Sequence, residues 1–129
     1  MREILFKAKR IDNGKWVEGY YQKRYDEMER ERHYIFLCKS NIVWEYAEID
    51  IDTLCWYTGK NDNNSNKIWE HDIVKQYADT DELGNDLYFF YEILWNEESA
   101  CFEGYEIYSA ETVSFDDLSD VEVVGNQLN

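Results

Sequence analysis

The most chemically suggestive residues are a histidine–aspartate pair, His71 and Asp72, near the middle of the chain. Such a pair can ligate a metal ion in phosphohydrolases, provided that another histidine and a distant aspartate converge on it. The other histidine of this chain is His33, and its surroundings predict strands instead of the helices that hold such centres. We therefore expect Glu70 and Asp72 to cap a turn that enters a strand, and we predict no metal site.

Two groups of carboxylates have the residue types that bind a divalent cation or act as a general acid and base. Asp50 and Asp52 alternate with isoleucines, so we expect them on the outer face of a half-buried strand. The second group lacks the spacing of an EF-hand loop and indicates a solvated turn. It comprises Asp79, Asp81, Glu82 and Asp86.

The cysteines Cys38, Cys55 and Cys101 lie in apolar or aromatic runs, where cysteine behaves as a small buried hydrophobic residue. Their odd number and unpaired spacing indicate free thiols in a reducing compartment. The sequence contains no Gly-rich phosphate loop, nucleophile elbow or zinc-ligand spacing. It therefore predicts no catalytic residue, no cofactor-binding residue and no enzyme activity.

Short aromatic and β-branched runs, separated by turn signals, must position these residues. Asn13-Gly14 predicts a type I′ hairpin turn, which needs positive φ at both central residues. The densely charged residues 25–32 predict a loop or a short exposed helix, and Ser114 predicts the N-cap of one helical turn. Seven or eight strands predict a mainly β fold, an antiparallel barrel or sandwich with one or two short helical segments. No linker or repeat interrupts the sequence, so we expect one domain over residues 1–129.

Charge is unevenly distributed along the chain, whose formal net charge is −15. All 13 Lys and Arg residues lie at or before Lys75, whereas residues 76–129 contain 14 acids and no Lys or Arg. Such a block is either a solvated surface or a face that docks on a basic partner, such as the N-terminal half of a neighbouring subunit. Cations and aromatic residues interleave among residues 6–32, as on surfaces that bind single strands, but neighbouring acids neutralise many of these cations.

The net charge disfavours nucleic acid and anionic membranes as partners. No apolar run approaches the roughly 20 residues of a membrane span. The N-terminus meets a charge too early for a signal peptide. We therefore expect a cytoplasmic protein that does not bind membranes.

A set of ordered motifs resembles the YopX family of bacteriophage and prophage proteins. That family has a Tyr-Thr-Gly, a polar turn, and then an Ile-Tyr-Glu-Gly-Asp-Ile-Val segment. Here His71 stands at the family's second glycine, which leaves open whether this turn needs positive φ, and we expect a free, solvent-facing imidazole. The residues that match the family's structural motif are Tyr57, Thr58, Gly59, Glu70, Asp72, Gly125 and Asn126.

The resemblance implies a β-rich fold, homo-oligomerisation and a mobile-element origin in a bacterial host, and it carries over no catalytic residue. Our leading hypothesis is a non-enzymatic accessory protein that acts through protein–protein contacts as a homo-oligomer, with a basic host or phage protein as a further candidate partner. Five Trp and eleven Tyr residues favour such contacts. One alternative is an acidic DNA mimic that inhibits a host nucleic-acid-binding protein, and a remote one is a metal-dependent hydrolase.

Overall fold

The computed structural model of the chain describes residues 4–38 and 44–129. It is 61% strand and 5% helical, with two antiparallel sheets that are not closed into a barrel. The predicted mainly β, antiparallel class is therefore confirmed.

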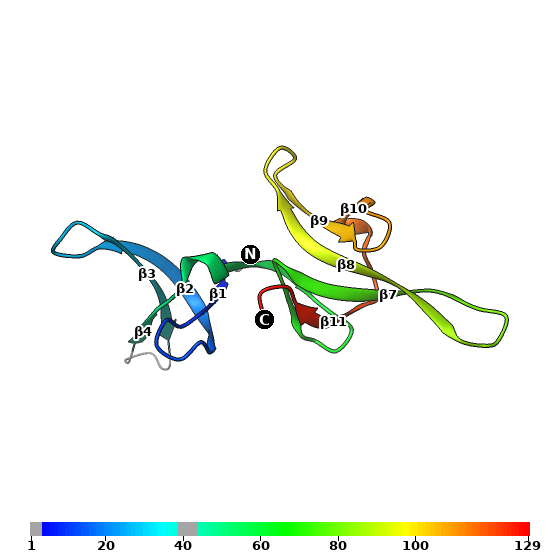
Figure 1. Cartoon of the computed structure of the whole chain (residues 1–129), viewed down its shortest axis with the longest axis horizontal. Coiled ribbons are helices and arrows are strands. Elements are labelled where there is room, and N and C mark those ends of the chain that lie inside the picture. Colours follow the sequence, from blue (N-terminus) through cyan, green and yellow to red (C-terminus); the bar gives the residue numbers. More distant parts are fainter. Residues whose placement is uncertain (1–3, 39–43) are drawn as a thin grey trace. The chain divides into compact units, whose positions relative to one another are not determined.

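The chain divides into two compact units, residues 1–57 and 58–129 (Figure 1). The single domain expected from the sequence stays a prediction. In the part of the chain that is described, no helix is long and apolar enough to cross a membrane.

The first unit is built from neighbouring antiparallel strands. Its hydrogen-bonded order is β4-β3-β2-β1-β5, where β5 continues into the second unit. A 3-10 turn, η1, separates β4 from β5. The elements are β1 (Phe6–Lys9), β2 (Trp16–Tyr25), β3 (Glu31–Cys38), β4 (Trp44–Glu48), η1 (Ile51–Thr53) and β5 (Cys55–Asn61).

The core of the first unit lies on one face of these strands. Ala8, Ile35 and Ile49 are almost completely buried there, and larger side chains such as Tyr21 pack against them. Gly19 permits β2 and β3 to approach closely, because a Cβ atom at this position would collide with the carbonyl oxygen of Phe36.

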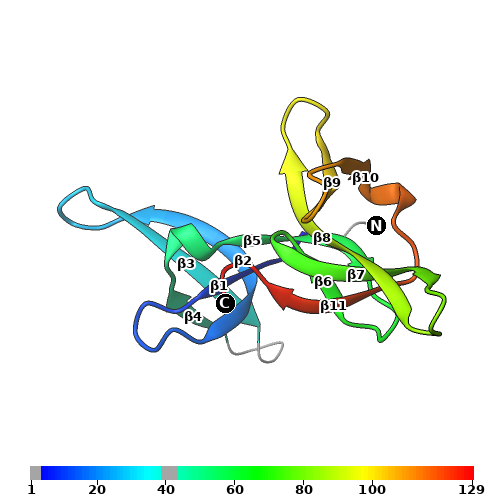
Figure 2. The ribbon, with the colours of Figure 1, turned by 45° about the vertical axis from the view of Figure 1, so that its right-hand side comes forward.

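The second unit contains the other sheet, whose order is β10-β9-β8-β7-β11. In addition, β6 pairs with β5. Figure 2 shows β11 beside β7, although β11 is the last strand of the sequence. The elements are β6 (Lys67–Trp69), β7 (Asp72–Thr80), β8 (Asp86–Asn96), β9 (Cys101–Glu106), β10 (Thr112–Ser114), η2 (Phe115–Asp117) and β11 (Val121–Asn126).

The core of the second unit combines aliphatic and aromatic side chains. Val74 and Ile93 are fully buried on the neighbouring strands β7 and β8. The rings of Trp95, Phe102 and Phe115 form a chain of edge-on contacts, with centroid distances of 5.0 and 6.1 Å. The helical turn predicted after Ser114 is η2, and it places Phe115 in this core.

The sequence prediction underestimated the hairpins. Eleven strands occur within the described residues instead of seven or eight, and two of them, β6 and β10, are only three residues long. Residues 26–30 form the loop that was one of the two predictions for residues 25–32, whereas β2 extends to Tyr25 and β3 begins at Glu31. The predicted type I′ turn is also wrong. Gly14 has a φ of +70°, but Asn13 is absent from the positive-φ residues, and the loop is four residues long.

Three hairpin loops have the same hydrogen-bond arrangement, in which one aspartate side chain stabilises a short turn. Each begins with an aspartate, Asp26, Asp62 or Asp81, whose carboxylate accepts the backbone N–H groups two and four residues later. The residue three positions after the aspartate has positive φ: Glu29, Ser65 or Gly84. The carboxylate therefore replaces backbone partners that a tight turn cannot supply.

The aspartate-anchored loops predict a specific acid sensitivity. The backbone N–H of Arg30 above all, with the Arg32 guanidinium and the Met28 N–H, lowers the pKa of Asp26 from 3.8 to about 2. Because the folded pKa is depressed, the stabilisation is complete above pH 3.8 and is lost as the pH falls through 2. We expect an NMR titration of the Asp26 carboxyl to have a midpoint near 2, and Asp26→Asn to weaken acid destabilisation in this range. A midpoint at the ordinary value would contradict the loop geometry.

Candidate functional site

The family-motif residues are distributed over both units. Tyr57 ends the first unit, where it is buried and its N–H donates to the Leu5 carbonyl at 2.9 Å. The remaining six belong to the second unit. Thr58 is buried in β5, and its hydroxyl donates to the Ile68 carbonyl of β6 at 2.7 Å. Gly59 follows with a φ of +89°, which glycine adopts without steric cost.

The carboxylate of Asp72 is the centre of the motif in the second unit. Asp72 is 2% exposed. Its Oδ2 accepts the backbone N–H of Trp69 at 2.8 Å, which closes the turn between β6 and β7. Its Oδ1 accepts the side-chain amide of Asn126 at 2.9 Å. One carboxylate thus joins a local turn to a strand that lies 54 residues further along the chain. The predicted turn-capping role of Asp72 agrees with this geometry.

Asn126 completes the link from the side of β11. Its amide nitrogen also donates to the Glu70 carbonyl at 3.3 Å, and its Oδ1 accepts the Leu128 N–H at 2.8 Å. The pairing of β11 with β7 shifts register between Val123 and Gly125. Gly125 has open space where a Cβ atom would lie. Glu70 thus contributes its backbone carbonyl to this link, and Asn126 contributes its side chain.

His71 occupies the backbone conformation that the family's glycine implies. Its φ is +69°, so this turn does require the left-handed region. Its N–H donates to the Ile93 carbonyl at 2.7 Å and its carbonyl accepts the Gln127 N–H at 2.8 Å. The expected free imidazole is wrong, because Nδ1 lies 3.2 Å from the Glu92 carboxylate and Nε2 lies 4.0 Å from that of Glu70.

Asp62 is a second buried carboxylate, and the sequence analysis missed it. Besides its own loop, it accepts the Val123 N–H of β11 at 2.9 Å. Burial raises its pKa, but the N–H groups of Val123, Asn66 and Asn64 outweigh that effect, so the pKa lies below its ordinary value. A recurring sequence feature could have revealed the role of Asp62, because an aspartate begins each of the three five-residue hairpin loops.

The other predicted acidic groups prove to be local structural elements. Asp50 does not share a strand face with Asp52, because it caps η1 by accepting the Asp52 N–H at 3.0 Å. Asp81 is occupied by its own loop. Within residues 4–38 and 44–129, no group of three or more His, Cys, Asp or Glu side chains could hold a metal ion.

Two cysteines have described surroundings. Cys55 is buried, as predicted, whereas Cys101 is exposed at the start of β9. The prediction of a buried thiol at Cys101 is therefore wrong, since the position follows the β8–β9 loop and lies outside the core. The side chain of Cys38 lies outside the described residues.

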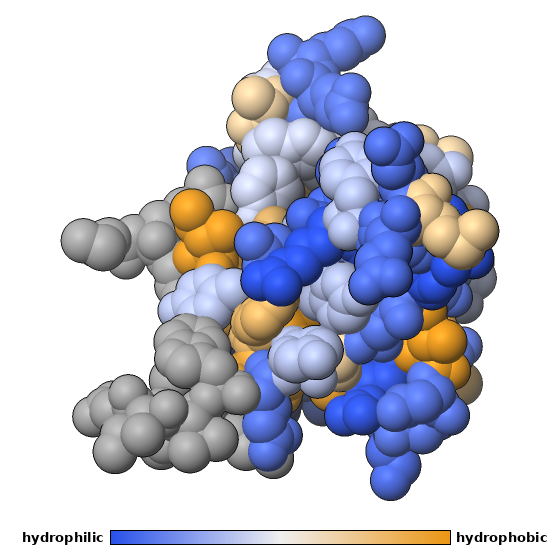
Figure 3. All heavy atoms as spheres, turned by 90° about the vertical axis from the view of Figure 1, so that its left-hand side faces the viewer, coloured by the Kyte–Doolittle hydropathy of each residue, from blue (hydrophilic) through white to orange (hydrophobic). Residues whose placement is uncertain are grey.

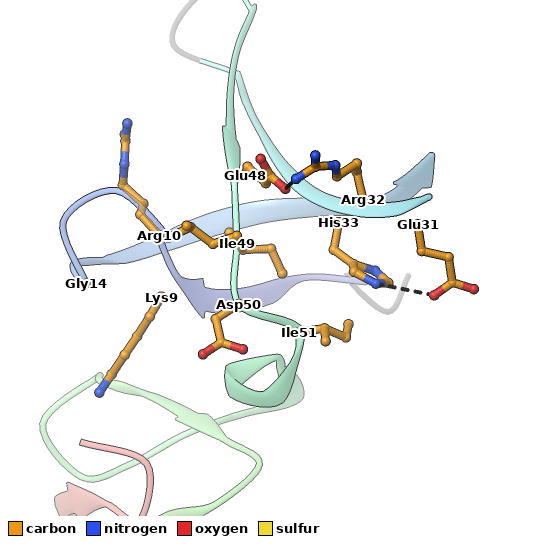
Figure 4. Close-up of a pocket in the computed structure, with 11 residues that line it drawn as sticks. Lys9, Arg10, Gly14, Glu31, Arg32, His33, Glu48, Ile49, Asp50 and Ile51 are labelled. Carbon is orange, nitrogen blue, oxygen red and sulfur yellow. Dashed lines mark hydrogen bonds and ion pairs between the residues drawn. The ribbon is translucent and has the colours of Figure 1, made fainter. Parts of the chain in front are cut away.

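A groove of about 470 Å³ opens on the first unit and brings together charged groups from several strands (Figure 4). Arg32 donates to the Glu48 carboxylate at 3.1 Å. His33 lies between the Tyr21 hydroxyl, 2.6 Å from Nδ1, and the Glu31 carboxylate, 3.6 Å from Nε2. Figure 4 shows the Lys9 side chain extending away from these pairs. Two pairs, Arg32 with Glu48 and His33 with Glu31, therefore form within this groove.

The comparisons with known proteins agree with the motif. The family model described as YopX protein matches residues 5–128. The chain therefore belongs to the YopX family, and the resemblance drawn from its sequence is confirmed. No curated protein gives a significant match.

The positive φ of His71 predicts a stabilising substitution. His71→Ala and His71→Gly both remove the imidazole, but only glycine also removes the Cβ atom that disfavours this conformation. We expect His71→Gly to exceed His71→Ala by about 1 kcal/mol in free energy of unfolding, and to be at least as stable as the wild type. Urea denaturation of the three proteins measures this. Equal stability of the glycine and alanine variants would show that the turn does not constrain this residue.

Proposed function

We propose that the chain is a non-enzymatic phage or prophage accessory protein that acts through protein–protein contacts as a homo-oligomer. Membership of the YopX family suggests a phage-associated protein of unclear role. The other parts of the proposal are the protein–protein contacts, the homo-oligomer and action in the cytoplasm of a bacterial host. They rest on the exposed side chains and the charge of the chain.

The observation that carries the proposal is the exposure of large aromatic side chains on regular strands. Tyr20 and Tyr46 of the first unit are 52% and 65% exposed, and Tyr77 of the second is 54% exposed. Tyrosines are enriched in protein interfaces, because they bury a large rigid surface and keep a polar hydroxyl. Tyr20 and Tyr46 lie on either side of Phe36 on one sheet face, unlike the scattered apolar residues of an ordinary surface.

The distribution of charge supports contacts between copies. Residues 1–57 contain 11 acids and ten Lys or Arg residues, whereas residues 58–129 contain 17 acids and three lysines. A strongly acidic unit gains most from a partner that presents cations. The first unit of another copy carries ten such cations. Because every copy contains both units, the cationic partner is present wherever the acidic unit is.

The charge of the second unit also favours one alternative, an acidic DNA mimic that inhibits a host nucleic-acid-binding protein. Such a mimic presents carboxylates in place of phosphates to a basic binding surface. A basic host or phage protein is then the partner, instead of a second copy of the chain.

The proposal predicts self-association. We expect sedimentation-velocity and light-scattering measurements from micromolar to millimolar concentration to give a mass that is a multiple of 15.6 kDa. Self-association should weaken as salt is added, because part of the attraction is between opposite charges. A monomer across the whole range would contradict the homo-oligomer and leave the DNA mimic as the better account.

A further inference from the structure

One face of the first unit carries a continuous group of aromatic rings around an arginine. Because β2, β3 and β4 pair in register, Tyr20, Phe36 and Tyr46 lie directly across from one another. We call this group the aromatic face. Its members are Tyr20, Arg24, Tyr34, Phe36 and Tyr46. Figure 3 views the first unit from the side of β3 and β4, where pale and orange side chains are interspersed with blue ones.

The aromatic face is a preformed surface with a shallow hollow. Tyr34, Phe36 and Tyr46 form a ring cluster with centroid distances of 5.6 to 6.5 Å. The guanidinium of Arg24 lies 5.2 Å from the centroid of the Phe36 ring. These four side chains line a hollow of about 150 Å³. The side chains therefore already hold one another in place, which reduces the entropy lost on binding.

Arg24 differs from the other arginines in the described part of the first unit. Arg10 pairs with Asp12, Arg30 with Asp26, and Arg32 with Asp26 and Glu48. Arg24 instead donates to the Gln22 side chain at 3.2 Å and lies against Phe36. Its guanidinium, which can bind a carboxylate through two parallel hydrogen bonds, has no carboxylate partner among the described residues.

The second unit presents a segment of complementary chemistry. Residues 77–89, which we call the acidic arm, are the end of the β7–β8 hairpin beyond its pairing with β9 and β11. The acidic arm carries four carboxylates and no Lys or Arg. It also exposes Leu83, at 88%, as well as Tyr77, Leu87, Tyr88 and Phe89. None of its carboxylates has a cationic partner among the residues that the structure describes.

We propose that the acidic arm of one copy docks on the aromatic face of a second copy. This inference rests on the proposed homo-oligomer and names its surfaces. Arg24 would bind arm carboxylates, and the rings would cover the apolar side chains of the arm. The two surfaces differ, so copies associate either reciprocally, as a two-fold dimer with two such contacts, or head to tail, as a closed ring or an open chain. Nucleic acid fits the same face less well, because the chain as a whole is strongly acidic.

The test uses one variant of each surface and one matched control for each. The face variant is Arg24→Glu with Tyr46→Ala, and the arm variant is Glu82→Lys with Leu83→Ala. Lys15→Glu and Glu97→Lys make the same charge changes at exposed positions outside the two surfaces. Thermal melts establish that each variant is folded.

We expect the face and arm variants each to raise the dissociation constant for self-association at least about tenfold, and the controls to change it less than about twofold. An equimolar mixture of the face and arm variants should recover association, since the intact arm of one fits the intact face of the other. Self-association that is as strong in either variant as in the wild type, or a mixture that does not recover, would overturn the docking and leave the homo-oligomer intact.

A wild-type chain that is monomeric throughout would overturn both the docking and the homo-oligomer. A labelled single-stranded oligothymidine tests the alternative ligand. If it binds the wild type and is lost only in the face variant, the aromatic face belongs to nucleic acid and the proposed docking is wrong.

Discussion

A carboxylate that is removed from water needs hydrogen-bond donors to compensate for its lost hydration, and Asp72 obtains them from two distant parts of the chain. Trp69 supplies one from the preceding turn, and Asn126 supplies the other from the last strand. The pairing of β11 with β7 involves the same residues, because Asp72 and Asn126 are directly opposite each other in the register. The last strand of the sequence is thereby held at the edge of the second sheet.

The residues around Asp72 have positions that this link imposes. His71 must turn the chain with positive φ so that Asp72 enters β7 and faces inward. Asp62 ties the neighbouring loop to β11 through Val123. Two buried aspartates therefore fix one strand, and the most distinctive segment of the family motif is accounted for by folding. The surfaces for which we propose a function lie elsewhere, on side chains outside that motif.

Much of the fold follows from local patterns in the sequence. Alternating β-branched and aromatic residues predicted the antiparallel class, and Ser114 correctly predicted the position of η2. Strand ends were harder, because Glu31 and Arg32 are too polar to resemble a strand yet pair with β2 next to the Asp26 loop. Asp50 was misplaced because alternation with isoleucines cannot distinguish a strand from a 3-10 turn over so few residues.

The candidate site was predictable only in part. The family motif indicated that Asp72 matters, but its partner Asn126 is 54 residues away, and a single sequence contains no signal for such a pairing. The half-buried contact of His71 with Glu92 depends in the same way on strand register. Exposure is likewise a tertiary property. The sequence shows that Trp and Tyr are abundant, but it does not show which of their rings remain at the surface.

The central structural claim is that Asp72 and Asn126 act as one unit, and a double-mutant cycle tests it most directly. Urea denaturation would measure Asp72→Ala, Asn126→Ala and the double variant. Asp72→Ala should cost about 2 kcal/mol or more, because it leaves the buried Trp69 N–H without its acceptor. The double variant should be at least about 1 kcal/mol less destabilised than the sum of the single variants. Additive losses would contradict the claim that this pair joins the turn to the last strand.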